Sequence, residues 1–228
     1  MNMPITLPKL SGSALKVIAI LSMLVDHCAY FLMDGNTLTY EAMRCVGRIA
    51  FPVFAFLIAE GFTHTRNRKK YFGQLLAFAV VSEIPWYLLN GADGTHNVMF
   101  TLALGVAALA VFEKLKTDSA VCICSILLIA WFATWSGVDY EWRCILVIVI
   151  FHLSGTGKAS FPFGRMVQLL CAFPLMMHYG IIGAMLACTV IFLYDGTRGF
   201  VKGKVWKYVF YAFYPLHLAV IKIICIWT

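Results

Sequence analysis

Charged residues are scarce in this chain. Only 13% of its 228 residues are charged, whereas 61% are hydrophobic and the mean hydropathy is +0.83. Soluble domains are about 45–50% apolar and about 25% charged. A water-soluble globule of this length cannot bury so much apolar surface. The composition therefore excludes a soluble protein and indicates an integral membrane protein.

Several sequence signatures are also missing. No HExxH or GxSxG motif is present, which argues against an intramembrane protease. No low-complexity tract or soluble segment interrupts the apolar pattern, so residues 1–228 are expected to form one domain. The pair Cys122-x-Cys124 has the wrong spacing for two metal ligands on one helix face, and we expect no metal. The eight cysteines are expected to be small packing residues.

The apolar residues form continuous runs instead of alternating, which excludes the strands of a membrane barrel. Eight runs are plain and a ninth fits the pattern. They span 15–33, 45–63, 71–90, 98–112, 119–135, 141–153, 165–177, 180–194 and 206–227. A bilayer core of about 30 Å requires roughly 20 helical residues. The sequence therefore predicts an all-α bundle of about nine transmembrane helices, with two short ones turning at His178–Gly180.

Lysine and arginine are distributed unevenly among the connections, which predicts the orientation of the chain. All but four of the 18 basic residues fall in alternate connections when the N-terminus is placed in the cytoplasm. The four exceptions are Arg44, Arg48, Arg143 and Lys222. We therefore expect the N-terminus inside and the C-terminus outside. The formal net charge of +7 then reflects cytoplasmic loops that face anionic membrane lipids, not a nucleic acid partner.

Six ionisable side chains are expected to lie inside predicted spans: Asp26, His27, Arg48, Glu60, Glu83 and His217. Each charged group at mid-membrane costs about 2.5–3.5 kcal/mol on insertion scales. One interpretation is that they pair between helices and hold the bundle together. Three of them are followed or preceded closely by proline, in "GRIAFP", "SEIP" and "YPLH". Because proline bends a helix and frees a carbonyl, we predict that these three line one polar chamber.

Lys16 and His27 are predicted to share one face of the first helix. They are eleven positions apart, and eleven helical steps of about 100° each bring the side chain back nearly to its starting direction. At about 1.5 Å per residue, His27 lies roughly 16 Å from Lys16, near the membrane midplane. The cation is then expected at the cytoplasmic entrance and the imidazole deep in the bundle.

Five blocks of the sequence resemble the TraX family. They are "LKVIAILSMLVDH" (15–27), "RIAFPVFAFLIAEGFTHTRN" (48–67), "SEIPW" (82–86), "NVMFT" (97–101) and "YPLHL" (214–218). The resemblance covers essentially the whole chain, and the second block is the most specific. The family is named after a protein required for N-terminal acetylation of a conjugative pilin. The Lys16-x10-His27 spacing is also similar to a basic-x10-His pattern in acyltransferase-3 membrane enzymes, which carry acyl groups from cytoplasmic acyl-CoA to outer acceptors.

The resemblance implies an acetyltransferase in the bacterial cytoplasmic (inner) membrane, with acetyl-CoA as donor. His27 resembles the catalytic base, and Asp26 a possible helper. The expected phosphate-binding residues are Lys16, Arg66, Arg68, Lys69 and Lys70. The residues expected to bind the acceptor or the reacting carbonyl are Arg48, Glu83, Asn97, Thr101, Tyr214 and His217. The resemblance further implies an acceptor on the outer side, which is expected to be a peptide amine or a glycan hydroxyl.

Other interpretations of the same residues stay open. Asp26 can pair with another helix instead of His27, because adjacent helical residues diverge by about 100°. The basic loop 66–70 can bind lipid headgroups. A proton-coupled transporter or flippase also needs intramembrane His, Glu and Arg, although such proteins often show two similar halves, which this sequence lacks. An assembly scaffold without chemistry would need no histidine at position 27.

Overall fold

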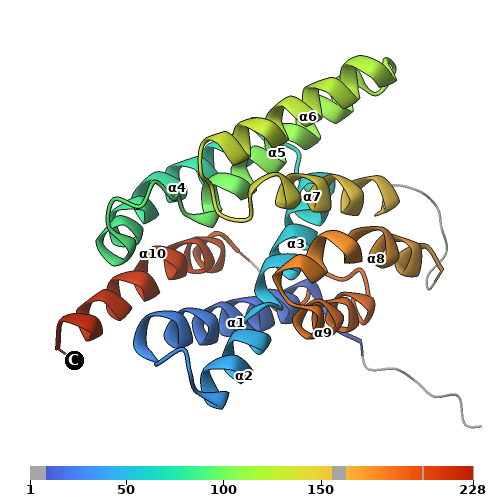
Figure 1. Cartoon of the computed structure of the whole chain (residues 1–228). Coiled ribbons are helices and arrows are strands. Elements are labelled where there is room, and N and C mark those ends of the chain that lie inside the picture. Colours follow the sequence, from blue (N-terminus) through green and yellow to red (C-terminus); the bar gives the residue numbers. More distant parts are fainter. Residues whose placement is uncertain (1–8, 156–162, 202, 228) are drawn as a thin grey trace, which may run out of the picture.

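The computed structural model describes residues 9–155, 163–201 and 203–227 (Figure 1). In these ranges the only extended pairings are two isolated bridges, Leu10–Tyr194 and His96–Val138. The predicted all-α class is therefore confirmed. The helices, in chain order, are α1 (Gly12–Leu32), α2 (Leu38–Gly47), α3 (Ala50–His64), α4 (Arg68–Asn90), α5 (Val98–Leu115), α6 (Ser119–Trp135), α7 (Glu141–Gly155), α8 (Phe163–Met176), the 3-10 turn η1 (Met177–Tyr179), α9 (Ile181–Phe192) and α10 (Lys204–Trp227).

Helix α3 is central in the bundle and contacts α1, α5, α7 and α9 (Figure 1). Two of its buried alanines, Ala55 and Ala59, present only a methyl group, so the neighbouring helices can approach closely. The larger Phe56 fills the space beside them and packs edge to face on Phe151 of α7, with ring centroids 5.5 Å apart. Close packing of this kind holds helices together where lipid surrounds them.

The predicted span 45–63 is two helices with a break at Arg48–Ile49. Pro52 accounts for the break. It has no backbone N–H, and helices tolerate this only in their first turn, so α3 begins two residues before it. Gly47, the last residue of α2, lies against α1. A Cβ atom there would lie 2.2 Å from Oδ1 of Asp26, so only glycine permits this approach.

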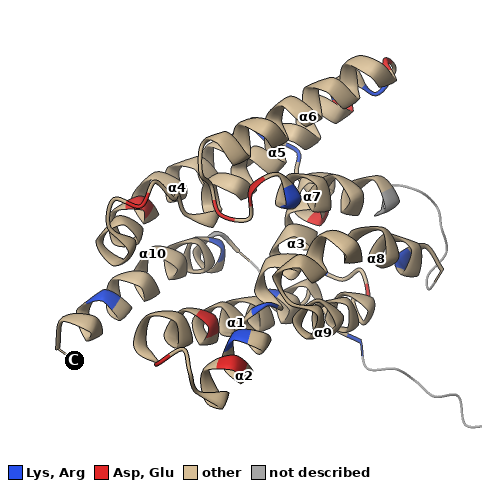
Figure 2. Cartoon of the chain, in the orientation of Figure 1, with Lys and Arg blue, Asp and Glu red and all other residues tan. Residues whose placement is uncertain are grey.

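Five segments are long and apolar enough to cross a membrane: 12–32, 38–64, 68–90, 98–115 and 205–227. Two shorter apolar helices are α6 and α9. The outward faces of several helices carry exposed large apolar side chains, among them Ile84, Leu128 and Ile223. The middle stretches of α5, α6 and α9 carry no charged residue (Figure 2). Apolar surface of this extent is stable against lipid and not against water, so the chain is a membrane protein.

The region 165–195 is a pair of helices, as the sequence predicts, and not one long kinked helix. Helix α8 ends at Met176, the turn η1 follows, and α9 begins at Ile181. Gly180 between them has φ of 135°, which side chains rarely adopt. The chain therefore reverses at the predicted turn.

Connections far apart in the sequence meet at two ends of the bundle. At one end, which we call the basic end, Leu10 N–H donates to Leu193 O and Gly12 N–H to Thr197 O. At the other end, Thr101 Oγ1 donates to the carbonyl of Asp139. Two of the segments predicted to be cytoplasmic, the N-terminal segment and the α9–α10 connection, thus meet at the basic end. Two of the basic residues predicted to be cytoplasmic, Lys158 and Lys202, lie outside the described residues.

Candidate functional site

His27 of α1 and His217 of α10 are hydrogen-bonded to each other. His27 Nδ1 lies 2.7 Å from His217 Nε2. The ring planes differ by only 3° and the centroids are 4.9 Å apart, which is what an in-plane, edge-to-edge bond of this length gives. Tyr214 stands edge-on to both rings, and Phe31 is edge-on to His27. These contacts fix the orientation of both imidazoles within the helix pair.

Asp26 pairs with α2 and not with the adjacent histidine. Arg44 Nη1 donates to Asp26 Oδ2 at 2.7 Å, and Arg44 also lies over the ring of Tyr30, 5.0 Å from its centroid. The side chains of both Asp26 and Arg44 are largely shielded from solvent. Of the two interpretations left open by the sequence, the structure has the one in which Asp26 binds another helix. The direct partner of His27 is His217.

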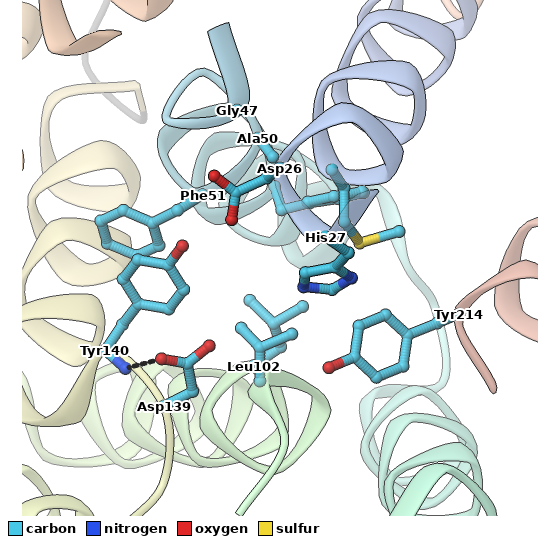
Figure 3. A pocket seen from close by; sticks show the side chains of 12 residues that line it. Asp26, His27, Gly47, Ala50, Phe51, Leu102, Asp139, Tyr140 and Tyr214 are labelled. Atoms are coloured by element: carbon cyan, nitrogen blue, oxygen red, sulfur yellow. Dashed lines mark hydrogen bonds between the residues drawn. The ribbon is translucent and has the colours of Figure 1, made fainter. Parts of the chain in front are cut away.

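A small cavity of about 30 Å³ lies beside His27, between α1, α3, α5, α10 and the α6–α7 connection. The side chains of His27, Tyr214 and Asp139 converge on it, with Leu102 between them (Figure 3). Among the described residues, two buried polar atoms have no hydrogen-bond partner, and both belong to this cavity: Asp26 Oδ1 and Tyr214 Oη. A buried polar atom without a partner costs about 1–3 kcal/mol, so both atoms are ready to bind a polar ligand.

Asp139 supplies a second carboxyl group to the small cavity. It lies in the α6–α7 connection, where the Tyr140 N–H donates to its Oδ1 at 3.0 Å (Figure 3). Burial raises the pKa of Asp139 to about 7, against the opposing effects of that hydrogen bond and of nearby Arg48. The carboxyl group therefore changes charge near neutral pH.

A much larger cavity of about 600 Å³ extends from the basic end toward the small cavity. Three cations line it: Lys16 from α1, Arg198 from the α9–α10 connection and Lys207 from α10. The α9–α10 connection is held in place by Ser13, whose hydroxyl donates to the Arg198 carbonyl at 2.7 Å. Lys207 Nζ donates to Gln74 Oε1. The lining also holds one carboxylate, Glu60, so with the three cations its net charge is positive. The three cations come from the two ends of the chain.

The two cavities share wall residues, namely Met23, Phe54, Val98, Leu102 and Tyr214. Lys16 lines the large cavity and His27 the small one, while Met23 between them lines both. This arrangement agrees with the predicted common face of the first helix. A long ligand with anionic groups at the basic end can therefore extend along α1 toward the His27 imidazole.

Glu83, Asn97 and Thr101 form polar contacts at the end of the bundle opposite the basic end. Asn97 Nδ2 donates to Glu83 Oε2 at 2.6 Å and to the Ala79 carbonyl at 2.9 Å. Its Oδ1 accepts from the Met99 N–H and caps α5. With Thr101 bonded to the Asp139 carbonyl, these groups join α4, α5 and the α6–α7 connection, and none of the three lines either cavity.

Arg48, Glu83 and His217 are held in three separate sets of contacts. Arg48 packs against Gly183 of α9, where an added Cβ atom would lie 2.3 Å from Arg48 Cβ. Glu83 accepts from or donates to His96 at 2.5 Å, depending on the protonation of the pair. His217 bonds His27. The three residues do not line the same cavity, so they do not form the predicted single chamber.

The residues of the predicted phosphate-binding loop, Arg66, Arg68, Lys69 and Lys70, are exposed and line neither cavity. Arg68 lies over the Phe62 ring, 4.4 Å from its centroid. The structure instead brings Arg198 and Lys207 to Lys16. The sequence shows both as basic residues near the last span, but only the fold places them beside a residue nearly 200 positions earlier.

The described side chains include no cluster of metal ligands. Within the described ranges, no three His, Cys, Asp or Glu side chains are grouped as a metal ion requires. Cys122 is buried and Cys124 is exposed, so the two face different directions on α6. The expectation that no metal takes part stays a prediction.

Comparison with known proteins places this geometry in context. The model of the TraX family, described as "TraX protein", matches residues 11–225. A curated relative from Dichelobacter nodosus, named "Probable fimbrial assembly protein FimC, serogroup H1", is 33% identical over 92% of this chain and 94% of its own length. An uncharacterized protein of Rickettsia prowazekii (strain Madrid E) is 25% identical over 64% of this chain and 56% of its own. No solved structure matches.

Proposed function

This chain belongs to the TraX family, and on that premise we propose that it is a membrane acetyltransferase. It moves an acetyl group from cytoplasmic acetyl-CoA to an amine or hydroxyl acceptor on the outer side of the bacterial cytoplasmic membrane. The single observation that carries the proposal is the large cavity, which leads from three cations at the basic end to the wall it shares with the His27 cavity.

The cavity suits acetyl-CoA in charge and in size. Its volume of about 600 Å³ lies within the usual range of about 300–1,000 Å³ for small-molecule sites. Lys16, Arg198 and Lys207 offer charge-assisted hydrogen bonds to the phosphates of the nucleotide end. The pantetheine arm then extends along α1, and the thioester reaches the level of His27.

The reaction is direct acyl transfer. The acceptor's nitrogen or oxygen attacks the thioester carbonyl carbon while His27 removes the acceptor's proton. The carbon–sulfur bond breaks, the CoA thiolate leaves, and the proton on His27 passes to that thiolate. The products are the acetylated acceptor and free CoA. Tyr214 Oη, which has no partner among the described residues, supports the proposal as a donor to the carbonyl oxygen while it gains negative charge.

The acceptor approaches from the opposite end of the bundle. The printed name of the Dichelobacter nodosus relative concerns fimbrial assembly, which favours the N-terminal amine of a pilin-like peptide as acceptor. Two carboxyl groups, Asp26 and Asp139, line the small cavity and can accept hydrogen bonds from the neutral amine that attacks the thioester. The predicted orientation, with nine spans, the N-terminus inside and the C-terminus outside, brings donor and acceptor from opposite sides.

The test uses the full-length protein in detergent with radiolabelled acetyl-CoA and a synthetic peptide that has a free N-terminal amine. His27→Ala is expected to abolish label transfer while acetyl-CoA binding changes little. Arg198→Ala is expected to raise KM for acetyl-CoA about tenfold, because a charge-assisted hydrogen bond contributes about 1.5 kcal/mol or more, and to leave kcat nearly unchanged.

Two controls sharpen this test. Lys114→Ala removes an exposed lysine that lines neither cavity, and its KM should stay at the wild-type value. Acetyl-dephospho-CoA, which lacks one phosphate, should bind less tightly to the wild type than acetyl-CoA. Normal turnover by His27→Ala would remove His27 as the base. In a parallel assay with the protein in lipid vesicles, movement of labelled acetyl-CoA into the vesicle lumen without label transfer would instead indicate a transporter.

A further inference from the structure

The carbonyl of Phe213 determines which nitrogens of the histidine pair carry protons. His217 Nδ1 lies 2.8 Å from this oxygen. A carbonyl oxygen has lone pairs and no hydrogen, so it can only accept, and His217 Nδ1 must carry the proton. In a neutral imidazole the other nitrogen is then an acceptor. His217 Nε2 therefore presents a lone pair toward α1.

The same reasoning extends to His27. Its Nδ1 lies 2.7 Å from the His217 Nε2 lone pair, so it is the donor of that bond. The proton of neutral His27 is then on Nδ1, and its Nε2 is unprotonated. No side chain or carbonyl among the described residues bonds His27 Nε2, and the ring lines the small cavity. His27 Nε2 is therefore the nitrogen of the histidine pair that offers a free lone pair to a ligand.

We propose that His217 is a positioning residue that holds His27 in the tautomer with a free Nε2. The Phe213 carbonyl determines the tautomer of His217, and His217 in turn determines the tautomer of His27. This inference rests on the proposed function, because it assigns the atom that removes the acceptor's proton. When Nε2 takes that proton, His27 becomes a cation whose Nδ1–H bonds the His217 lone pair more strongly. His217 thereby stabilises the charge that develops during transfer, without contacting the substrate.

Neighbouring contacts support a role in orientation. The nearly coplanar rings, with 3° between their planes, allow a well-aligned N–H···N bond. Phe213 packs with its ring parallel to that of His217, at 5.2 Å and 14°. His217 is itself buried, with 6% of its surface exposed, so it is less available to a substrate than His27. Asp26, the other candidate to orient His27, is bonded to Arg44.

The decisive measurement is the tautomer state, which does not depend on activity. The full-length protein is labelled with 15N-histidine, and the ring nitrogens are observed by NMR in detergent at neutral pH. His27→Gln and His217→Gln each remove one set of signals and so assign them. The expected result is a proton on Nδ1 and none on Nε2 in both residues. In His217→Phe, the His27 signals should change to a mixture of tautomers.

The kinetic measurement tests the positioning role. His217→Phe removes the acceptor and should lower kcat about 100-fold, with KM for acetyl-CoA within about twofold of wild type. His217→Gln keeps an acceptor oxygen and should recover activity to within about tenfold of wild type. His178→Phe, which replaces an exposed histidine outside both cavities, serves as the matched control and should be unchanged.

Each outcome has a distinct meaning. A proton on His27 Nε2 in the wild type, or unchanged His27 signals in His217→Phe, would overturn the tautomer assignment. Full kcat in His217→Phe would overturn the positioning role even with the expected tautomers. If the wild type transfers no label at all, the proposed function fails, while the NMR result still decides which nitrogens carry protons.

Discussion

Gly47→Ala should disturb the Asp26–Arg44 pair and destabilise the bundle. The new Cβ atom would lie 2.2 Å from Asp26 Oδ1, 2.4 Å from its Cβ and 2.6 Å from its Cγ. Ordinary contacts of a Cβ atom begin at 3.4 Å, so the α1 backbone or the Asp26 side chain must move by more than 1 Å. A shift of this size breaks a hydrogen bond that is 2.7 Å long.

The expected magnitude follows from these two effects. Overpacking costs about 1–3 kcal/mol, and a hydrogen bond between charged groups contributes about 1.5–3 kcal/mol. A combined loss of about 3 kcal/mol corresponds to a fall in Tm of roughly 10 °C for a chain of this length. Because Asp26 lines the small cavity beside His27, the same variant should also lower acetyl transfer.

The assay is thermal unfolding in detergent, with two glycine controls on other helices. Gly73→Ala meets no atom within 4 Å, and because alanine favours helix by about 1 kcal/mol it should leave Tm unchanged or raise it slightly. Gly105→Ala meets the flexible end of the Ile148 side chain, at 2.3 Å from Cδ1, so its fall should be intermediate. Equal Tm values for Gly47→Ala and Gly73→Ala would refute the reasoning.

Two further predictions concern pH and topology. Because the pKa of Asp139 is raised to about 7, its contribution to stability is present below the unfolded pKa of about 4 and is lost as the pH rises to 7. Asp139→Asn should therefore flatten the fall of Tm between pH 5 and 7.5, and an unchanged profile would count against the burial of this carboxyl group. For topology, single cysteines at Arg66 and Asn36 on a cysteine-free background should react with an impermeant thiol reagent from opposite sides of the membrane. Labelling of both from outside would exclude the proposed orientation.

Much of the site is visible in the sequence because its periodicity is local. The eleven-residue separation of Lys16 and His27 is a property of any α-helix, so their common face could be predicted without a structure. The same holds for the turn at Gly180, where a glycine separates two short apolar runs. By contrast, the predicted phosphate-binding roles of Arg66, Arg68, Lys69 and Lys70 depend on the direction of a loop, which the sequence does not determine. In the structure these residues line neither cavity.

The sequence by itself determined the helical class, the membrane environment and the position of His27 within α1. These depend on composition and on the 3.6-residue repeat, which act within one segment. The tertiary structure decided the partners: His217 for His27, Arg44 for Asp26, and Arg198 beside Lys16. The physical reason is that hydrogen bonds and shared cavities depend on how helices distant in the sequence pack, and helical periodicity carries no information on that packing.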